Sequence, residues 1–143
     1  MTVFVDTAVI MYAVGTAHPL KAASAEILRR VASGALHGVT SAEVIQEIVH
    51  RFVHAGRPER AAEVAGHALA VFSPVVPVSH AVVERLPGLL ARYPNAAARD
   101  LLHVATCLEE RIGTIVTPDR DFDGISELRR ADPADPATLA LRD

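Results

Sequence analysis

The sequence opens with Met1-Thr2-Val3-Phe4-Val5-Asp6-Thr7, a run of β-forming residues that leads directly into a carboxylate. Residues 2–5 predict a short buried strand. An ionised carboxylate cannot lie within such an apolar run, but it can follow the C-terminal end of the strand. In open α/β sheets, ligands and catalytic groups gather at that edge. Asp6 is therefore either the N-cap of a following helix or the first residue of a functional site.

The composition is typical of a globular protein with a substantial core. Half of the 143 residues are hydrophobic, and the length favours a single domain over residues 1–143. We expect a cytoplasmic protein, because no apolar run approaches the ~18 residues of a membrane span and no signal peptide is recognisable. The net charge of −3 argues against a surface that is positive throughout, so any binding of nucleic acid would depend on a local basic patch. Cys107 is the only cysteine, which excludes an intramolecular disulfide and a cysteine-based zinc site.

Hydrophobic periodicity predicts short strands that alternate with helices. Expected strands cover residues 2–5, 36–40, 74–78 and 114–117, and expected helices cover residues 7–14, 19–33, 41–54, 58–71, 79–92 and 96–111. Thr40-Ser41-Ala42-Glu43 has the pattern of a capping box, and Asn95 is an expected N-cap. The tail from Ala131 to Asp143 shows little periodicity. This order of elements predicts a three-layer α/β/α fold with a short central parallel sheet.

Four acidic residues stand where such a fold would bring them toward one edge of the sheet. Asp6 and Asp119 follow strands, whereas Glu47 and Asp100 lie beside the apolar stripes of helices. Each acid also has an ordinary explanation, such as helix capping or, for Glu47, an i,i+4 ion pair with Arg51. Taken together, four acids on elements that converge on one edge are better explained by a site.

The spacing of these acids resembles that of the PIN-domain nucleases, and most closely that of the VapC-type toxins of bacterial toxin–antitoxin pairs. The resemblance covers roughly residues 2–130, and its fragments are Val3-Phe4-Val5-Asp6-Thr7, Ser41 with Glu47, Arg99-Asp100-Leu101-Leu102-His103-Val104-Ala105-Thr106 and Ile115-Val116-Thr117-Pro118-Asp119-Arg120-Asp121-Phe122-Asp123. The resemblance implies catalytic roles for Asp6, Glu47, Asp100 and Asp119, with Thr7, Ser41 and Thr117 in support. The neighbouring Asp121 and Asp123 leave the identity of the fourth acid open.

Clustered carboxylates repel one another unless a cation compensates their charge. Mg²⁺ or Mn²⁺ is the natural choice because both ions prefer oxygen ligands and retain bound water. We expect Asp6, Asp100, Asp119 and Asp121 to bind the metal, and metal-activated water to hydrolyse an RNA phosphodiester bond. Arg99 and Arg120 are candidates for RNA contacts.

The resemblance also implies two protein partners, namely a small antitoxin and a second copy of the chain. The apolar helices expected at residues 20–33 and 41–54 are candidates for both surfaces. A non-catalytic PIN-like binding module, or a PIN nuclease of RNA processing outside toxin–antitoxin pairs, remains as an alternative. A haloacid-dehalogenase phosphatase is disfavoured because it needs Asp-x-Asp where this chain reads Asp6-Thr7-Ala8.

Overall fold

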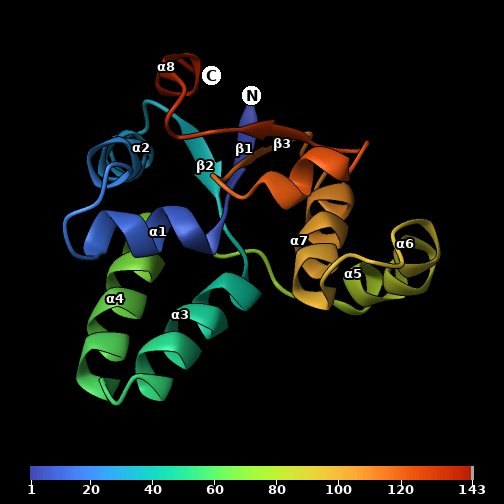
Figure 1. The fold of residues 1–143 in the computed structure, drawn as a ribbon, viewed down its shortest axis with the longest axis horizontal. Coiled ribbons are helices and arrows are strands. Elements are labelled where there is room, and N and C mark those ends of the chain that lie inside the picture. Colours follow the sequence, from blue (N-terminus) through green and yellow to red (C-terminus); the bar gives the residue numbers. More distant parts are fainter. Residues whose placement is uncertain (143) are drawn as a thin grey trace.

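The fold is a four-stranded parallel sheet with helices on both of its faces (Figure 1). This computed structural model describes residues 1–142, and within them the strands lie in the order β2-β1-β3-β4. Every neighbouring pair is parallel. The strand bounds are Thr2–Val5 for β1, His37–Val39 for β2, Thr114–Val116 for β3 and Arg129–Ala131 for β4. The α/β/α architecture with a short parallel sheet is therefore as the sequence predicted.

The helices fall into three groups around the sheet. Figure 1 shows α1 and α2 on one side of the sheet and α5, α6 and α7 on the other, while the α3–α4 pair extends away from it. Their bounds are Thr7–Val14 (α1), Lys21–Ala32 (α2), Ala42–His54 (α3), Pro58–Val71 (α4), His80–Glu84 (α5), Leu86–Arg92 (α6), Ala98–Glu109 (α7) and Pro136–Leu139 (α8), with a 3₁₀ helix, η1, over Arg120–Gly124. No helix within residues 1–142 is both long and apolar enough to cross a bilayer.

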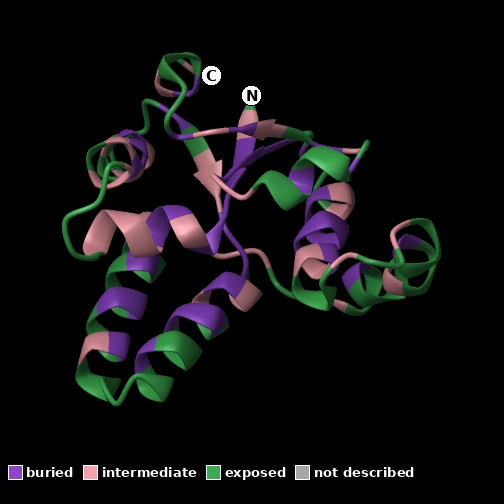
Figure 2. Ribbon diagram, in the orientation of Figure 1, coloured by how far each residue is buried: buried purple, intermediate pink, exposed green. Residues whose placement is uncertain are grey.

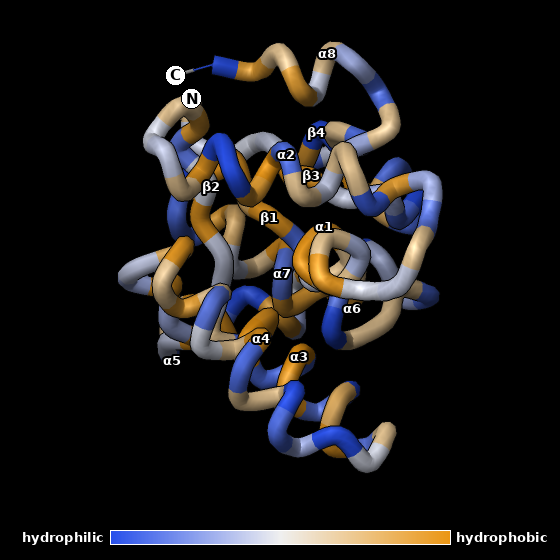
Figure 3. The backbone as a smooth tube through the Cα atoms, turned by 90° about the vertical axis from the view of Figure 1, so that its left-hand side faces the viewer, coloured by the Kyte–Doolittle hydropathy of each residue, from blue (hydrophilic) through white to orange (hydrophobic). Residues whose placement is uncertain are grey.

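Strand β1 is the centre of the core. Val3, Phe4 and Val5 have no solvent exposure, and Figures 2 and 3 show this strand as a buried, hydrophobic segment inside the molecule. Phe4 pairs with β2 on one side and β3 on the other. The Asp6 amide then donates to the Val116 carbonyl at 3.1 Å, which holds the end of β1 against the end of β3. The sheet thus fixes the position of the first acid.

Glycine at position 38 allows α2 to pack closely on the edge strand β2. A Cβ atom added to Gly38 would lie 2.5 Å from Cγ2 of Val31, which is far inside van der Waals contact. Any larger residue would push the helix or the Val31 side chain away from the strand. The first crossover of the sheet therefore depends on a residue without a side chain.

Two of the predicted helix caps are wrong. Ser41, not Thr40, is the N-cap of α3, and its hydroxyl accepts from the Val44 amide at 3.3 Å. The Thr40 hydroxyl instead donates to the carbonyl of Val5, the last residue of β1, at 2.8 Å. Asn95 caps nothing, since α7 begins at Ala98 with Ala97 as its N-cap. The first of these shifts places the Thr40 hydroxyl at the carboxyl end of β1.

The strand predicted over residues 74–78 and the irregular tail are also wrong. Only Val76 makes a bridge, to Ser41, because Pro74 and Pro77 lack the amide hydrogens that a ladder needs. Strand β4, which ends at the first residue of the tail, pairs with β3 as a fourth strand, and α8 lies within the tail. The predicted tail extended to Asp143, which lies outside the described residues. The added strand is important because it borders the acidic segment after β3.

Candidate active site

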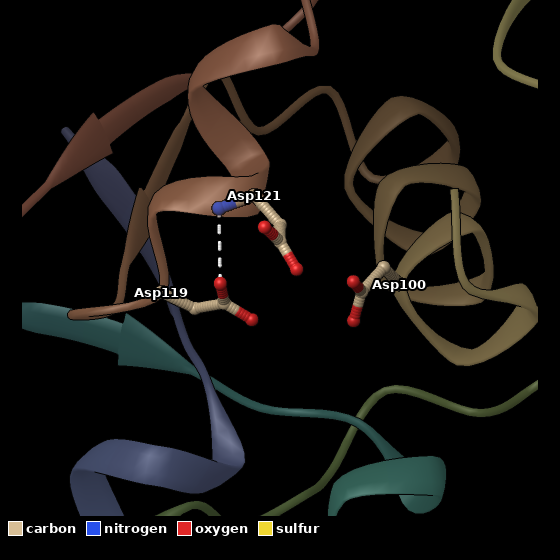
Figure 4. A group of neighbouring side chains, drawn as sticks. All are labelled: Asp100, Asp119 and Asp121. Atoms are coloured by element: carbon tan, nitrogen blue, oxygen red, sulfur yellow. Dashed lines mark hydrogen bonds between the residues drawn. The ribbon is translucent and has the colours of Figure 1, made fainter. Parts of the chain in front are cut away.

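Three carboxylates form a compact group beyond the carboxyl ends of the strands. Asp100 lies in the first turn of α7, Asp119 follows β3, and Asp121 belongs to η1. Each offers an oxygen atom, and these atoms all lie within 4.8 Å of one another. Figure 4 shows the three side chains directed toward a common space. Elements that are distant in sequence thus bring hard oxygen donors together, which is the arrangement that Mg²⁺ and Mn²⁺ require.

The turn after β3 decides which acids face this space. Asp119 is the N-cap of η1, and its Oδ1 accepts from the Asp121 amide at 2.9 Å (Figure 4). Asp123 is turned away, since its two oxygens accept from Arg130 at 2.7 Å (Nε) and 3.3 Å (Nη2). That ion pair lowers the pKa of Asp123. Asp119 and Asp121 therefore belong to the group, whereas Asp123 is a structural partner of β4.

Asp6 lies beside the group and has the first of the two roles that the sequence left open, that of a helix N-cap. Its Oδ1 accepts from the Thr7 amide at 2.8 Å, so it caps α1, and its Oδ2 accepts from the Thr117 hydroxyl at 2.8 Å. The same hydroxyl accepts from the Asp119 amide at 3.1 Å. Burial raises the pKa of Asp6, and the nearby charge of Asp119 acts in the same direction, whereas the two hydrogen bonds oppose it. Thr117 thus joins two of the predicted acids.

Glu47 is buried at the side of the site and is held by two arginines. Arg51 Nη2 lies 3.0 Å from Oε2, as the i,i+4 spacing predicted, and Arg99 Nε lies 3.2 Å from Oε1. Arg99 also lies 3.6 Å from Glu43, which is at the second position of α3 rather than in a capping box. Arg99, an expected RNA contact, is therefore tied to two carboxylates of α3. Its charge compensates Glu47 and links α7 to α3.

The electrostatics of the group fit a bound cation. The pKa of Asp100 rises to about 6, first because of burial and then because of the negative charges of Asp119, Asp6, Asp121 and Glu47. No cationic side chain forms an ion pair with Asp100, Asp119 or Asp121 in the described part of the chain. The three carboxylates share one space, and no positive charge among the described residues compensates them. All of their possible metal ligands are oxygen atoms, which suits a divalent ion such as Mg²⁺ or Mn²⁺.

His103 packs beside the site as a neutral side chain. Its Nε2 lies 3.6 Å from Oδ1 of Asp6, and its ring lies against Phe4 with the centroids 5.5 Å apart. Burial lowers the pKa of His103 to about 4, so the ring is uncharged at neutral pH. It therefore supports Asp6 by packing and does not compensate its charge.

The remaining predicted residues have more local roles. Thr7 contributes its amide to Asp6, Ser41 caps α3, and Arg120 is exposed at the start of η1. The sequence prediction missed Arg130, which holds Asp123 and also lies 3.0 Å from Asp132. Arg130 was visible in the sequence as a basic residue close to Asp132, but its role depends on β4, which was not predicted.

Comparison with known proteins agrees with this geometry. The family model described as PIN domain matches residues 3–128. The chain belongs to the PIN-domain family. Ribonuclease VapC13 of Mycobacterium tuberculosis is 35% identical over 128 residues, covering 90% of this chain and 98% of the relative. Ribonuclease VapC23 of the same organism is 38% identical over 117 residues, covering 82% and 92%. Within the family, the chain is thus of the VapC type.

Solved structures share the fold at low sequence identity. VapBC2 from Rickettsia felis, solved bound to a DNA fragment from its promoter, has a TM-score of 0.73 at 19% identity, covering 92% of this chain and 98% of the matched chain. FitAcB from Neisseria gonorrhoeae has a TM-score of 0.71 at 16% identity, covering 92% and 97%. These likenesses confirm the PIN-like fold that the sequence predicted.

Proposed function

We propose that this PIN-domain chain is a divalent-metal-dependent endoribonuclease and the toxin of a toxin–antitoxin pair. The observation that carries the proposal is the group of Asp100, Asp119 and Asp121, whose oxygens lie within 4.8 Å of one another. Relatives over 30% identical along most of the chain are named as VapC ribonucleases, which supports RNA as the substrate. The carboxylates account for the chemistry without a serine or cysteine nucleophile, and Cys107 is buried with its pKa raised to about 12.

The three-acid group would hold the cation, with Asp6 beside it. A Mg²⁺ or Mn²⁺ ion bound there supplies positive charge to the scissile phosphate and lowers the pKa of a coordinated water. Asp6 is kept in place beside the group by hydrogen bonds from the Thr7 amide and the Thr117 hydroxyl. Glu47, compensated by Arg51 and Arg99, would orient water or help to position a second ion.

The antitoxin is the partner that the solved relatives suggest. The chain shares its fold with a toxin–antitoxin complex from Klebsiella pneumoniae and with DNA-bound VapBC from Salmonella typhimurium. We extend this to the present chain as a proposal, together with a homodimer in the cytoplasm. The test is co-expression with the product of the neighbouring small open reading frame. An active chain that neither binds this product nor forms dimers would contradict the toxin assignment.

The enzymatic proposal is tested with purified protein, total RNA and Mg²⁺, followed by mapping of the new 5′ ends. We expect discrete cleavage that EDTA abolishes and that added Mg²⁺ or Mn²⁺ restores. D100N is the essential control, because contaminating ribonuclease would cleave equally in both preparations. Cleavage that is unchanged by EDTA or by D100N would overturn the proposal. D123N should lose less activity than D100N, since Asp123 faces Arg130 rather than the acidic group and can affect the site only through the turn of η1.

A further inference from the structure

A pocket of about 420 Å³ adjoins the acidic group on the side of α6 and α7. Asp100 and Asp121 belong both to the acidic group and to the lining of the pocket, and residues 92–97 form much of the rest of the lining. Its volume falls within the range of about 300–1,000 Å³ that is usual for small-molecule sites. Neither the capping of α7 nor the acidic group requires such a hollow.

One wall of the pocket is an aromatic side chain that is held rigidly. The Tyr93 hydroxyl donates to Oε2 of Glu127 at 2.6 Å and accepts from the Ser126 amide at 3.1 Å. The guanidinium of Arg92 lies over the Tyr93 ring, 5.5 Å from its centroid, and forms an ion pair with Glu127. Arg92 and Tyr93 are thus both held by the segment that carries Ser126 and Glu127. A ligand that packs on their flat surfaces would need to immobilise little, so the cost in conformational entropy would be small.

The rest of the lining combines an apolar floor with groups that form hydrogen bonds. Phe122 and Ile125 are buried beneath the pocket, whereas the Asn95 side chain is exposed at its rim. Ala97 is the N-cap of α7 and has no side-chain oxygen, so no side chain caps the first amides of the helix. Flat apolar surface next to an amide and free backbone donors matches the faces and edges of a nucleobase.

We propose that this pocket binds one base of the RNA, next to the scissile phosphate. The inference rests on the proposed function, because the acids that border the pocket are those that would act on the phosphate. A strand whose phosphate lies at Asp100 and Asp121 must place a neighbouring nucleotide within reach of the pocket. Guanidinium and aromatic planes stack on bases, and an amide can read a base edge. The pocket would thereby select the base at one position of the cleaved sequence.

The test uses two pocket variants and one matched control. A97F fills the pocket with a ring, N95A removes the amide, and A91F adds the same ring on an exposed position of α6 that does not line the pocket. Each protein cleaves a pool of random-sequence RNA with Mg²⁺, and the new ends are sequenced. We expect a base preference at one position beside the cleaved bond for wild type and A91F. A97F should lose this preference and cleave the preferred sequence at least about tenfold more slowly, and N95A should weaken the preference.

Unchanged preference and rate in both pocket variants would overturn the base subsite. So would weaker antitoxin binding by A97F with an unchanged preference, since the pocket would then serve a protein partner. If A97F unfolds early on heating, N95A decides, because its side chain is exposed. Should the wild type not cleave RNA at all, the proposed function fails separately. Saturation-transfer NMR with the four ribonucleoside 5′-monophosphates then tests the pocket: signals lost only in A97F support it, and equal signals in A97F overturn it.

Discussion

Thr117 connects two acids of the site through one hydroxyl group. It donates to Asp6 and accepts from the Asp119 amide, and it has no solvent exposure. T117V keeps the shape but leaves Asp6 without this donor, so we expect kcat/KM for RNA cleavage to fall by about 10–100-fold, as is typical for residues that orient metal ligands. T117S keeps the hydroxyl and should retain most activity. Equal rates for T117V and wild type would contradict this role.

Asp100 is expected to reduce the stability of the metal-free protein at neutral pH. Its pKa is raised from 3.8 in the unfolded chain to about 6 in the fold. Between these values the folded state binds more protons, so the stability contributed by this group falls as the pH rises from about 4 to about 6. In EDTA, D100N should therefore exceed the wild type in Tm at pH 7 and differ less at pH 4.

The measurement is thermal unfolding of both proteins across that pH range. A gain of ~1 kcal/mol corresponds to about 2–4 °C for a protein of this size. D123N is the matched control, because pairing with Arg130 lowers the pKa of Asp123 and its removal brings no such gain. A Tm difference between D100N and wild type that is the same at both pH values would contradict the expected coupling.

At the scale of single residues, the position of an acidic residue in the fold is easiest to predict where that residue follows a strand. Asp6 and Asp119 follow apolar runs, and the parallel sheet brings them to the same edge. The choice between Asp121 and Asp123 could not be made in this way, because both lie in one turn of η1. Only the position of Arg130 on β4 shows that Asp123 is engaged elsewhere. A short strand of charged residues carries no hydrophobic pattern from which to predict it.

At the scale of elements, β4 and η1 act as one unit through Arg130. The guanidinium contacts Asp123 and Asp132 and donates to the Thr117 carbonyl at 3.3 Å. R130A should loosen the turn that carries Asp119 and Asp121, and a displacement of about 1 Å there can cost up to ~10²-fold in rate. R129A is the control, since Arg129 is exposed on the same strand. We expect kcat in an RNA cleavage assay to fall for R130A only; equal losses would argue against this role.

The errors in predicting element boundaries have two physical causes. A sequence pattern predicts that a hydroxyl caps the helix. It does not show which of two adjacent hydroxyl residues forms a hydrogen bond elsewhere in the fold. Thr40 is drawn to the Val5 carbonyl, so Ser41 caps α3 and Glu43 becomes free to meet Arg99. The strand over residues 74–78 was predicted from its valines, but the two prolines beside them lack the amide hydrogens that a ladder needs. In the first case a tertiary contact overrides a local preference, and in the second the prolines themselves prevent the ladder.

At the scale of the whole molecule, the site joins segments from both halves of the chain. Asp100 on α7 meets Asp119 and Asp121 after β3, next to Asp6 at the end of β1. A cation that binds only this assembled group stabilises the fold by RT ln(1 + [L]/Kd), about 2.7 kcal/mol at a concentration of 100 Kd. Mg²⁺ or Mn²⁺ should therefore raise the Tm of the wild type in a concentration-dependent way.

Paired variants show whether the gain in Tm comes from the three-acid group. D121N removes a carboxylate that faces the common space. D123N, two positions further along the chain, makes the same change in charge but removes a carboxylate that pairs with Arg130. We expect D121N to lose most of the metal-induced rise in Tm and D123N to keep it, measured by thermal unfolding over a metal titration. A wild type that does not respond to either metal would refute the metal site. Equal losses in the two variants would show instead that net negative charge, rather than a shaped site, attracts the ion.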